Sequence, residues 1–476
     1  EARTVLKNVA DNINQYEIAP DGQRALFGAR GEVFTVPAKH GITRNLTQTP
    51  GVHDRNCIWS PDGRWIAYIS DATGEDEIYV VPQDGSGPAR QVTDGAETYK
   101  YALRFSPDST RLPWSDKRLR LRYVEIETGI ITEVDHSQRW EFHNYHWSPD
   151  GRWIVYTKPE LDTVERVYLY SVEDKQSWPI TDTWYSVSNA TFSADGRFVF
   201  FTSDRDFNPI YSWTEWNHAY VDMSRIYFVT LAKDTPSPFE PENDEVAVKD
   251  ENHEADDDTA AADDDGGKLD KQEAEEDGDE PKKAEDDSKG KSQAETSEMR
   301  VDLEGIIGRV AALPIRAARY AHLTSVGDSL YYLRSGHKED QQLVVYDLKE
   351  KKETEIGGFR GYEVSADGKK MLLAAGGKYG IVDLPKGRVE LKDTLDLSGL
   401  EVFVDRRAEW RQIFHECWRQ MREFFYVPNM HGVDWAAIRD RYEPWVAHVR
   451  HRADLTYILG EMIGELNAGH CYVGDG

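Results

Sequence analysis

A turn motif recurs seven times in the first 400 residues, and this repeat constrains the fold more than any other feature. The motif reads Ser-Pro-Asp-Gly at residues 60–63 and 148–151, and variants of it occur at the other sites. Its aspartates lie at positions 21, 62, 108, 150, 195, 328 and 367, so five of the six steps between them span 39 to 46 residues and one spans 133. Repeats of about 40 to 50 residues are typical of β-propeller blades.

Each copy of the motif predicts a β-hairpin. An apolar residue ends one strand, Pro-Asp-Gly turns the chain, and an alternating apolar strand such as Trp65–Ile69 follows. A third strand and a polar closing strand, such as Glu77–Val81 and Ala89–Thr93, complete a four-stranded unit. We therefore expect residues 1–400 to form a seven-bladed β-propeller. The strand tryptophans and tyrosines are interpreted as packing between blades, and the aspartates as turn-formers.

The one long step contains an acidic segment. Residues 240–298 hold 25 Asp or Glu against 7 Lys, and so supply 18 of the 29 net negative charges. Few large apolar residues occur there, which predicts a disordered loop inserted in the fifth blade. Its role is either solubility or the binding of a partner. Nucleic acid is excluded as a partner because phosphate binding requires clustered Lys and Arg.

After residue 400 the apolar period changes from two to about 3.6 residues. The spacing predicts helices over Arg407–Phe425, after Asp434, and over Arg452–Leu466, with Asp454 as the N-cap of the last one. We therefore expect residues 401–476 to form a separate small helical domain. The predicted fold class is mainly β: a seven-bladed β-propeller followed by a small α-helical domain.

Composition limits the cellular setting. The chain has no run of about 18 apolar residues, so no membrane span and no membrane partner is expected. Three cysteines scattered over 476 residues do not predict a disulfide framework. This favours a reducing, cytoplasmic location, with the periplasm as the alternative. The chain starts without Met or a signal region, as expected for a piece of a longer polypeptide.

Most common catalytic motifs are missing from the sequence. His415-Glu416 begins like a His-Glu-x-x-His metalloprotease site, but residue 419 is Arg. The spacing of the remaining candidate ligands does not predict a zinc site; these are His415, Cys417, His431, His448, His451 and Cys471. There is also no Gly-x-Ser-x-Gly motif and no nucleotide-binding loop. We predict neither a metal nor a cofactor.

His470 is the one candidate catalytic residue. It follows the last predicted helix and lies between Gly469 and Cys471. A helix-exit turn can present an imidazole to a cleft, where its near-neutral pKa suits a general base. A purely structural histidine is the plainer interpretation. A Cys-His pair with Cys471 is disfavoured because adjacent side chains usually diverge.

The order of these features resembles the tricorn protease family. The similarity rests on the seven turn motifs, on residues 301–315 within the array, and on residues 410–446 and 455–476, the last reading "LTYILGEMIGELNAGHCYVGDG". In that family a six-bladed propeller precedes a seven-bladed one. A helical core domain follows, and then a PDZ domain and a catalytic domain related to tail-specific, C-terminal processing peptidases. The resemblance implies that this chain stops before the PDZ and catalytic serine domains.

By this resemblance, His470 matches the catalytic histidine that is general base to a serine outside the chain. The preceding position is often Ser in the family and is Gly469 here, a departure that affects an accessory hydrogen bond but leaves the base in place. The resemblance further implies peptide substrates, a propeller that acts as a substrate-access gate, a homo-oligomer (a hexamer in the family), and no peptidase activity of this fragment alone.

Two other functional classes fit parts of the sequence. A non-enzymatic, TolB-like propeller that binds a protein partner explains the repeats but gives no purpose to a helical tail ending in His470. A prolyl-oligopeptidase-type enzyme also carries a seven-bladed propeller, but its nucleophile motif is not present.

Overall fold

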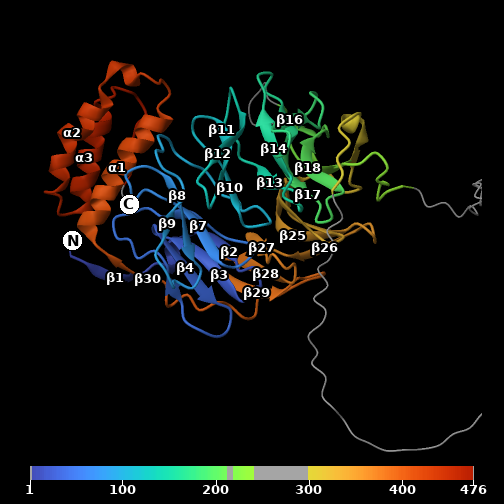
Figure 1. Cartoon of the computed structure of the whole chain (residues 1–476), viewed down its shortest axis with the longest axis horizontal. Helices are drawn as coiled ribbons and strands as arrows, with labels where there is room; N and C mark the ends of the chain where they lie inside the picture. The colour runs from blue at the N-terminus through green and yellow to red at the C-terminus, as the bar shows by residue number, and fades with distance from the viewer. Residues whose placement is uncertain (1–2, 212–217, 241–298, 475–476) are drawn as a thin grey trace, which may run out of the picture. The chain divides into compact units, whose positions relative to one another are not determined.

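The computed structural model describes residues 3–211, 218–240 and 299–474. Seven antiparallel sheets follow one another along the chain, each formed by sequence neighbours (Figure 1). The predicted seven-bladed β-propeller followed by helices is thereby confirmed. The first four sheets consist of β2 (Ile13–Ile18), β3 (Arg24–Ala29), β4 (Glu32–Pro37) and β5 (Arg44–Asn45); β6 (Arg55–Trp59), β7 (Trp65–Ser70), β8 (Glu77–Pro82) and β9 (Arg90–Gln91); β10 (Arg111–Ser115), β11 (Arg120–Glu125) and β12 (Ile131–His136); and β13 (Tyr145–Trp147), β14 (Trp153–Pro159), β15 (Glu165–Ser171) and β16 (Gln176–Pro179).

The other three sheets complete the ring of blades. They consist of β17 (Val187–Phe192), β18 (Phe198–Asp204), β21 (Ser224–Thr230) and β22 (Val310–Ala312); β23 (Arg319–Val326), β24 (Ser329–Gly336), β25 (Glu339–Asp347) and β26 (Lys352–Gly357); and β27 (Gly361–Val364), β28 (Lys370–Ala375) and β29 (Lys378–Asp383). A small hairpin of β19 (Pro209–Tyr211) and β20 (His218–Tyr220) extends the fifth blade between β18 and β21.

The repeated turn is held by hydrogen bonds within the motif. In the second blade the Ser60 hydroxyl donates to Asp62 at 2.6 Å, and the backbone N–H of Arg64 donates to the same carboxylate oxygen at 3.0 Å. The Ser60 oxygen in turn accepts from the backbone N–H of Trp65 at 2.9 Å. Gly63 has a φ of +77°, a conformation that glycine adopts without strain. The aspartates are therefore turn-formers, as predicted.

Large apolar side chains fill the spaces between blades. Val155 and Leu169 of the fourth blade form one cluster with Phe192, Phe201 and Val229 of the fifth, all nearly inaccessible to water. Alternation along each strand places such residues on the sheet faces, so neighbouring blades pack through them. This confirms the interpretation of the apolar repeat positions as core.

Two blades differ from the predicted four strands. In the described residues, the third and seventh sheets have three strands each. Segment 101–106 occupies the innermost position of the third blade and bonds to β10 only at intervals, for example from Tyr101 N to Ser115 O at 2.9 Å. Pro113 in β10 has no N–H to donate, which explains why a regular ladder does not form there.

The long insertion lies in the fifth blade, as predicted, because β21 and β22 are neighbours in one sheet. The expected disorder of the acidic segment, about residues 240–298, concerns positions that lie outside the described residues from 241 on.

The C-terminal part begins with a short ribbon and continues as three helices. Strand β30 (Glu401–Val404) pairs with β1 (Val5–Asn8), and α1 (Arg406–Phe424), α2 (Trp435–Val446) and α3 (Arg452–Gly464) follow. Short 3-10 turns occur at η1 (Ala10–Asn12), η2 (Ile306–Arg309) and η3 (Met430–Gly432). Asp405 and Asp434 cap α1 and α2 by accepting backbone hydrogen bonds.

The expected N-cap of α3 was wrong. His451 is the N-cap, and Asp454 lies three residues later, where its carboxylate accepts from the backbone N–H of His451 at 3.0 Å. This is the acidic half of a capping box, so the same carboxylate stabilises the helix start from inside the first turn. Among the described helices, none is both long enough and apolar enough to cross a membrane.

We expect Asp62→Ala to lower the free energy of unfolding of the second blade by about 1–2 kcal/mol, because it removes an acceptor used by two donors. Thermal or urea unfolding measures this change. Asp62→Asn keeps one acceptor oxygen and should cost less. Glu173→Ala removes an exposed carboxylate whose nearest cation is 4.0 Å away, and an equal effect from it would contradict the assignment.

Candidate functional site

The three helices form a bundle with its own apolar core. Trp410, Phe414 and Trp418 of α1 pack against α2 and α3 at helical spacing. The Trp418 indole donates to the carbonyl of Trp435 at 2.8 Å, and the Trp435 indole donates to the carbonyl of Trp418 at 3.0 Å. These reciprocal bonds fix α1 against α2. Since α3 packs on both, the position where it ends is also fixed.

His470 lies six residues after the end of α3, on an exposed turn. Its φ is +63°, a left-handed conformation that is uncommon for a residue with a side chain. Asn467, three residues earlier, has a φ of +48°, so the chain turns sharply twice after the helix. The ring of His470 is exposed to solvent rather than packed in the bundle. This placement leaves the imidazole accessible to another molecule or domain.

One polar side chain lies close to this ring. The hydroxyl of Tyr472 is 3.3 Å from Nδ1 of His470, and the two rings meet edge to face with centroids 6.3 Å apart. Cys471 is half-buried, and in the described residues no hydrogen bond joins its sulfur to His470. The geometry thus provides Tyr472, and not the neighbouring thiol, as the contact of the imidazole.

The other candidate histidines and the cysteines do not form a common site. His415 Nε2 is 3.2 Å from Glu443, whereas His431 contacts the Leu466 carbonyl at 3.0 Å and the Tyr426 hydroxyl at 2.5 Å. Cys57, Cys417 and Cys471 are free thiols. Over the described ranges, no three His, Cys, Asp or Glu side chains converge in a way that would hold a metal ion.

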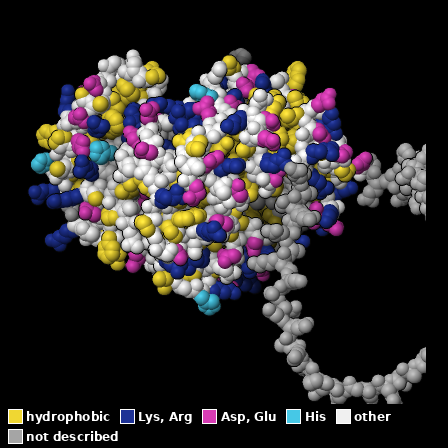
Figure 2. Space-filling view, viewed as in Figure 1, with side chains coloured by type: hydrophobic (Ala, Val, Ile, Leu, Met, Phe, Trp, Pro, Cys, Tyr) yellow, Lys and Arg dark blue, Asp and Glu magenta, His cyan; other side chains and the backbone are white. Residues whose placement is uncertain are grey.

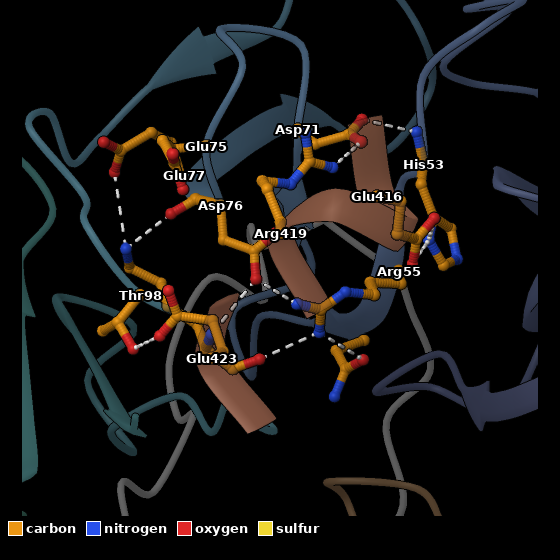
Figure 3. Close-up of polar contacts among 12 residues, drawn as sticks. His53, Arg55, Asp71, Glu75, Asp76, Glu77, Thr98, Glu416, Arg419 and Glu423 are labelled. Carbon is orange, nitrogen blue, oxygen red and sulfur yellow. Dashed lines mark hydrogen bonds and ion pairs between the residues drawn. The ribbon is translucent and has the colours of Figure 1, made fainter. Parts of the chain in front are cut away.

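Helix α1 contacts the propeller through a polar stripe that the sequence analysis did not identify. The stripe consists of Glu409, Gln412, Glu416, Arg419 and Glu423, which recur every three or four residues on one face of α1. Figure 3 shows several of these side chains directed toward the loops of the second blade. The stripe could have been predicted from the sequence, because these polar residues recur at helical spacing opposite the apolar face of the same helix.

Each residue of the stripe has a partner in the first blade, in the second blade or in the loop after the second blade. Glu409 pairs with Arg30, Glu416 with His53 at 2.9 Å, and Arg419 with Asp71. Gln412 donates to Asp71 at 3.0 Å, and Thr98 donates to Glu423 at 2.5 Å. Arg422, next to the stripe, binds both oxygens of Glu75 at 2.7 Å. The bundle is therefore attached to the propeller mainly by charged groups.

The pair of His53 and Glu416 is the titratable part of this junction. Burial alone would lower the pKa of His53, but the hydrogen bond and charge of Glu416 outweigh it and raise the pKa. Burial would likewise raise the pKa of Glu416, yet the bonds from His53 and Gln412 bring it down to about 2. Both partners are consequently charged in mildly acidic solution.

A second candidate site is a cavity of about 760 Å³ at the turns of the inner hairpins. Every blade contributes at least one lining residue from its turn region, in chain order Pro20, Pro61, Pro107, Pro149, Ala194, Ser325 and Asp367. Because all seven blades bound it, the cavity lies on the propeller axis, and we call this axial space the channel. Positive and negative side chains are interspersed over the face of the molecule that Figure 2 draws.

A seven-bladed propeller followed by a helical bundle defines the class of protein. Comparison with known families identifies the family. The profile of the tricorn protease second beta propeller domain matches residues 13–385, and the profile of the tricorn protease C1 domain matches residues 406–464. The chain belongs to the tricorn protease family.

Similar proteins agree with this assignment. Tricorn protease homolog 1 of Streptomyces coelicolor is 30% identical over 469 residues, covering 93% of this chain and 41% of its own length. A tricorn protease homolog of Saccharolobus solfataricus is 24% identical, with 98% and 39% covered. The crystal structure of the tricorn protease superposes with a TM-score of 0.78 at 17% identity, covering 98% of this chain and 42% of that one. This chain thus spans less than half the length of these relatives.

We expect His53→Gln to destabilise the junction by roughly 1 kcal/mol in mildly acidic solution, a modest value because both side chains are partly exposed. A raised histidine pKa contributes stability below about pH 6.5 that is lost as pH rises through the folded-state value. The lowered pKa of Glu416 contributes above about pH 4.5 and is lost at lower pH. Unfolding of wild type and variant should therefore differ most between these limits.

The matched control is His448→Gln, which changes an exposed histidine of the same bundle. It should show no such pH dependence. A His53→Gln effect that is as large at pH 9 as at pH 5.5 would argue against a charged pair.

Proposed function

We propose that this chain is the gate and general-base portion of a tricorn-type serine peptidase that degrades peptides. One observation carries the proposal: a propeller and a helical domain of the tricorn type occur in order and lead to an exposed imidazole. In this proposal residues 1–400 are the propeller domain and residues 401–476 the start of the helical core domain. A PDZ domain and a catalytic serine domain are supplied by polypeptide outside these residues.

In the proposed mechanism His470 removes the proton from a serine hydroxyl. Because the Tyr472 hydroxyl lies at Nδ1, we assign proton transfer to Nε2. The serine oxygen attacks the peptide carbonyl, the protonated imidazole gives its proton to the leaving amine, and water then hydrolyses the acyl-enzyme with His470 again as base. Gly469 offers no side chain for the accessory hydrogen bond, and Tyr472 is the nearby group that orients the ring.

The propeller performs no chemistry in this proposal. Its cavity, bounded by all seven blades, is the entrance through which an extended peptide reaches the catalytic part. In this proposal the propeller limits the substrates to unfolded or short chains. Assembly as a hexamer, as the family resemblance implies, would enclose the catalytic sites behind these entrances.

The experiment is a peptidase assay on the full-length protein that carries this chain. We expect His470→Ala to lower kcat by at least about a hundredfold, since general-base catalysis contributes about 10² to 10⁴. The melting temperature should not change, because the side chain is exposed. His448→Ala, another exposed histidine of the bundle, should keep full activity.

Turnover by His470→Ala equal to that of wild type would eliminate the assigned base. The 476-residue chain alone is expected to give no hydrolysis of the same peptides, and measurable hydrolysis by it would contradict the placement of the nucleophile in another segment.

A further inference from the structure

The innermost strands carry one equivalent position in each blade. It lies four residues before the aspartate of the repeated turn, and from the first blade to the seventh it is Glu17, Ile58, Arg104, His146, Thr191, Thr324 and Glu363. Pairing with the second strand shows a register shared by five blades, in which, for example, Glu17 faces Leu26, His146 faces Val155 and Glu363 faces Leu372. In the sixth blade the turn is shorter, and Thr324 faces Tyr331. We call these seven residues the inner tier.

Three members of the inner tier, Arg104, His146 and Thr191, line the cavity on the axis. Residues of the innermost strand are covered by neighbouring blades unless they reach the axial space, yet every member except Ile58 retains solvent exposure. A peptide that enters along the axis must therefore pass the three side chains at the cavity.

Arg104 is the one Lys or Arg of the tier, and its side chain is exposed. Its guanidinium donates to the Leu103 carbonyl at 3.1 Å, and across the described ranges no carboxylate lies within ion-pair distance of it. By contrast, Arg120 and Arg122 of the same blade both pair with Asp116. Arg104 thus presents a cation to the channel with donors available for a carboxylate.

The two carboxylates of the tier, Glu17 and Glu363, have raised pKa values and lie outside ion-pair distance of Arg104. Burial, and next the charge of Glu363, raise the pKa of Glu17 to about 8, although Arg104 and the Trp59 N–H oppose the shift. Burial also raises the pKa of Glu363, against the charges of His322 and Arg104. Glu363 is 3.6 Å from His322, its nearest partner.

The other titratable groups around Arg104 are Tyr145 and His146 of the fourth blade, and Asp21 and Asp367 of the turns that line the same cavity. Burial, followed by the charges of Arg104 and His322, lowers the pKa of His146 to about 3, so this ring is neutral at pH 7. Burial raises the pKa of Tyr145, whose hydroxyl bonds to the Ala102 carbonyl. Arg104 is thus the one Lys or Arg side chain that the inner tier presents to a peptide.

We propose that the inner tier is a charge filter in which Arg104 is the specificity-determining residue, favouring extended peptide segments that carry carboxylates over segments that carry amines. This inference rests on the proposed function because it takes the channel as the path of the peptide. It adds the class of substrate: acidic peptides. Above pH 8 ionised Glu17 adds a negative charge next to Arg104, and the preference weakens.

The test measures peptide binding to the 476-residue chain by fluorescence anisotropy. Three labelled octapeptides of Gly and Ser are used, carrying three Asp, three Lys or no charged residue. We expect Arg104→Gln to weaken binding of the acidic peptide about tenfold at pH 7 and to leave the neutral peptide within about twofold. Arg104→Lys should retain part of the preference for the acidic peptide, because lysine keeps the positive charge but lacks the planar guanidinium group that can bind a carboxylate through two N–H donors.

The matched control is Arg441→Gln, which removes the same charge from an exposed arginine of the bundle. This control separates a local effect of Arg104 from the effect of a change in the net charge of the chain. Glu17→Gln should abolish the weakening of acidic-peptide binding between pH 7 and 9. Equal effects of Arg104→Gln and Arg441→Gln, or acidic-peptide binding that is undetectable in the wild type, would overturn the filter.

The two proposals fail separately. Binding needs no hydrolysis, so the filter can be contradicted while His470→Ala still abolishes turnover. Conversely, an active His470→Ala enzyme would end the assignment of the base and leave the binding result unchanged.

Discussion

The hydrogen bonds within the repeated turn are the interaction on which the rest of this structure depends. Ser60 and Asp62 close the turn between the first two strands of their blade, and the same Ser-x-Asp bonding recurs in other blades, as at Ser148 and Asp150. A fixed turn sets the register of the hairpin, and register decides which side chains face the core. The inner tier and the channel opening follow from that register, because both lie next to the turn.

Much of the fold could be predicted from the sequence because the repeat and the apolar alternation are local signals. Seven blades, the place of the insertion and the helices after residue 400 follow from them. To predict the irregular third blade, one would need to know that Pro113 lies opposite the innermost segment. To predict the N-cap of α3, one would need the backbone angles of His451. Both depend on details of backbone geometry that residue types alone do not determine.

The candidate sites were only partly foreseeable. His470 stands out by its place after a helix, but its contact with Tyr472 depends on a left-handed turn. Glu17, Arg104 and Glu363 are far apart in sequence and share a surface only because the ring of blades closes. The aligned repeat contained that signal, since all three lie four residues before the aspartate of the repeated turn. The stripe on α1 was legible as periodic charge, yet its partners on the second blade were not.

The junction between α1 and the propeller has a consequence for the response to salt. The core of the bundle contains residues from Trp410 onward, whereas its attachment to the blades is mainly ionic. Ion pairs at a partly wetted surface can exchange partners with little loss of buried apolar area, unlike interdigitated side chains. Ion pairs of this kind weaken as salt is added, whereas apolar cores do not, so the contact between α1 and the propeller is the part of the structure most sensitive to ionic strength.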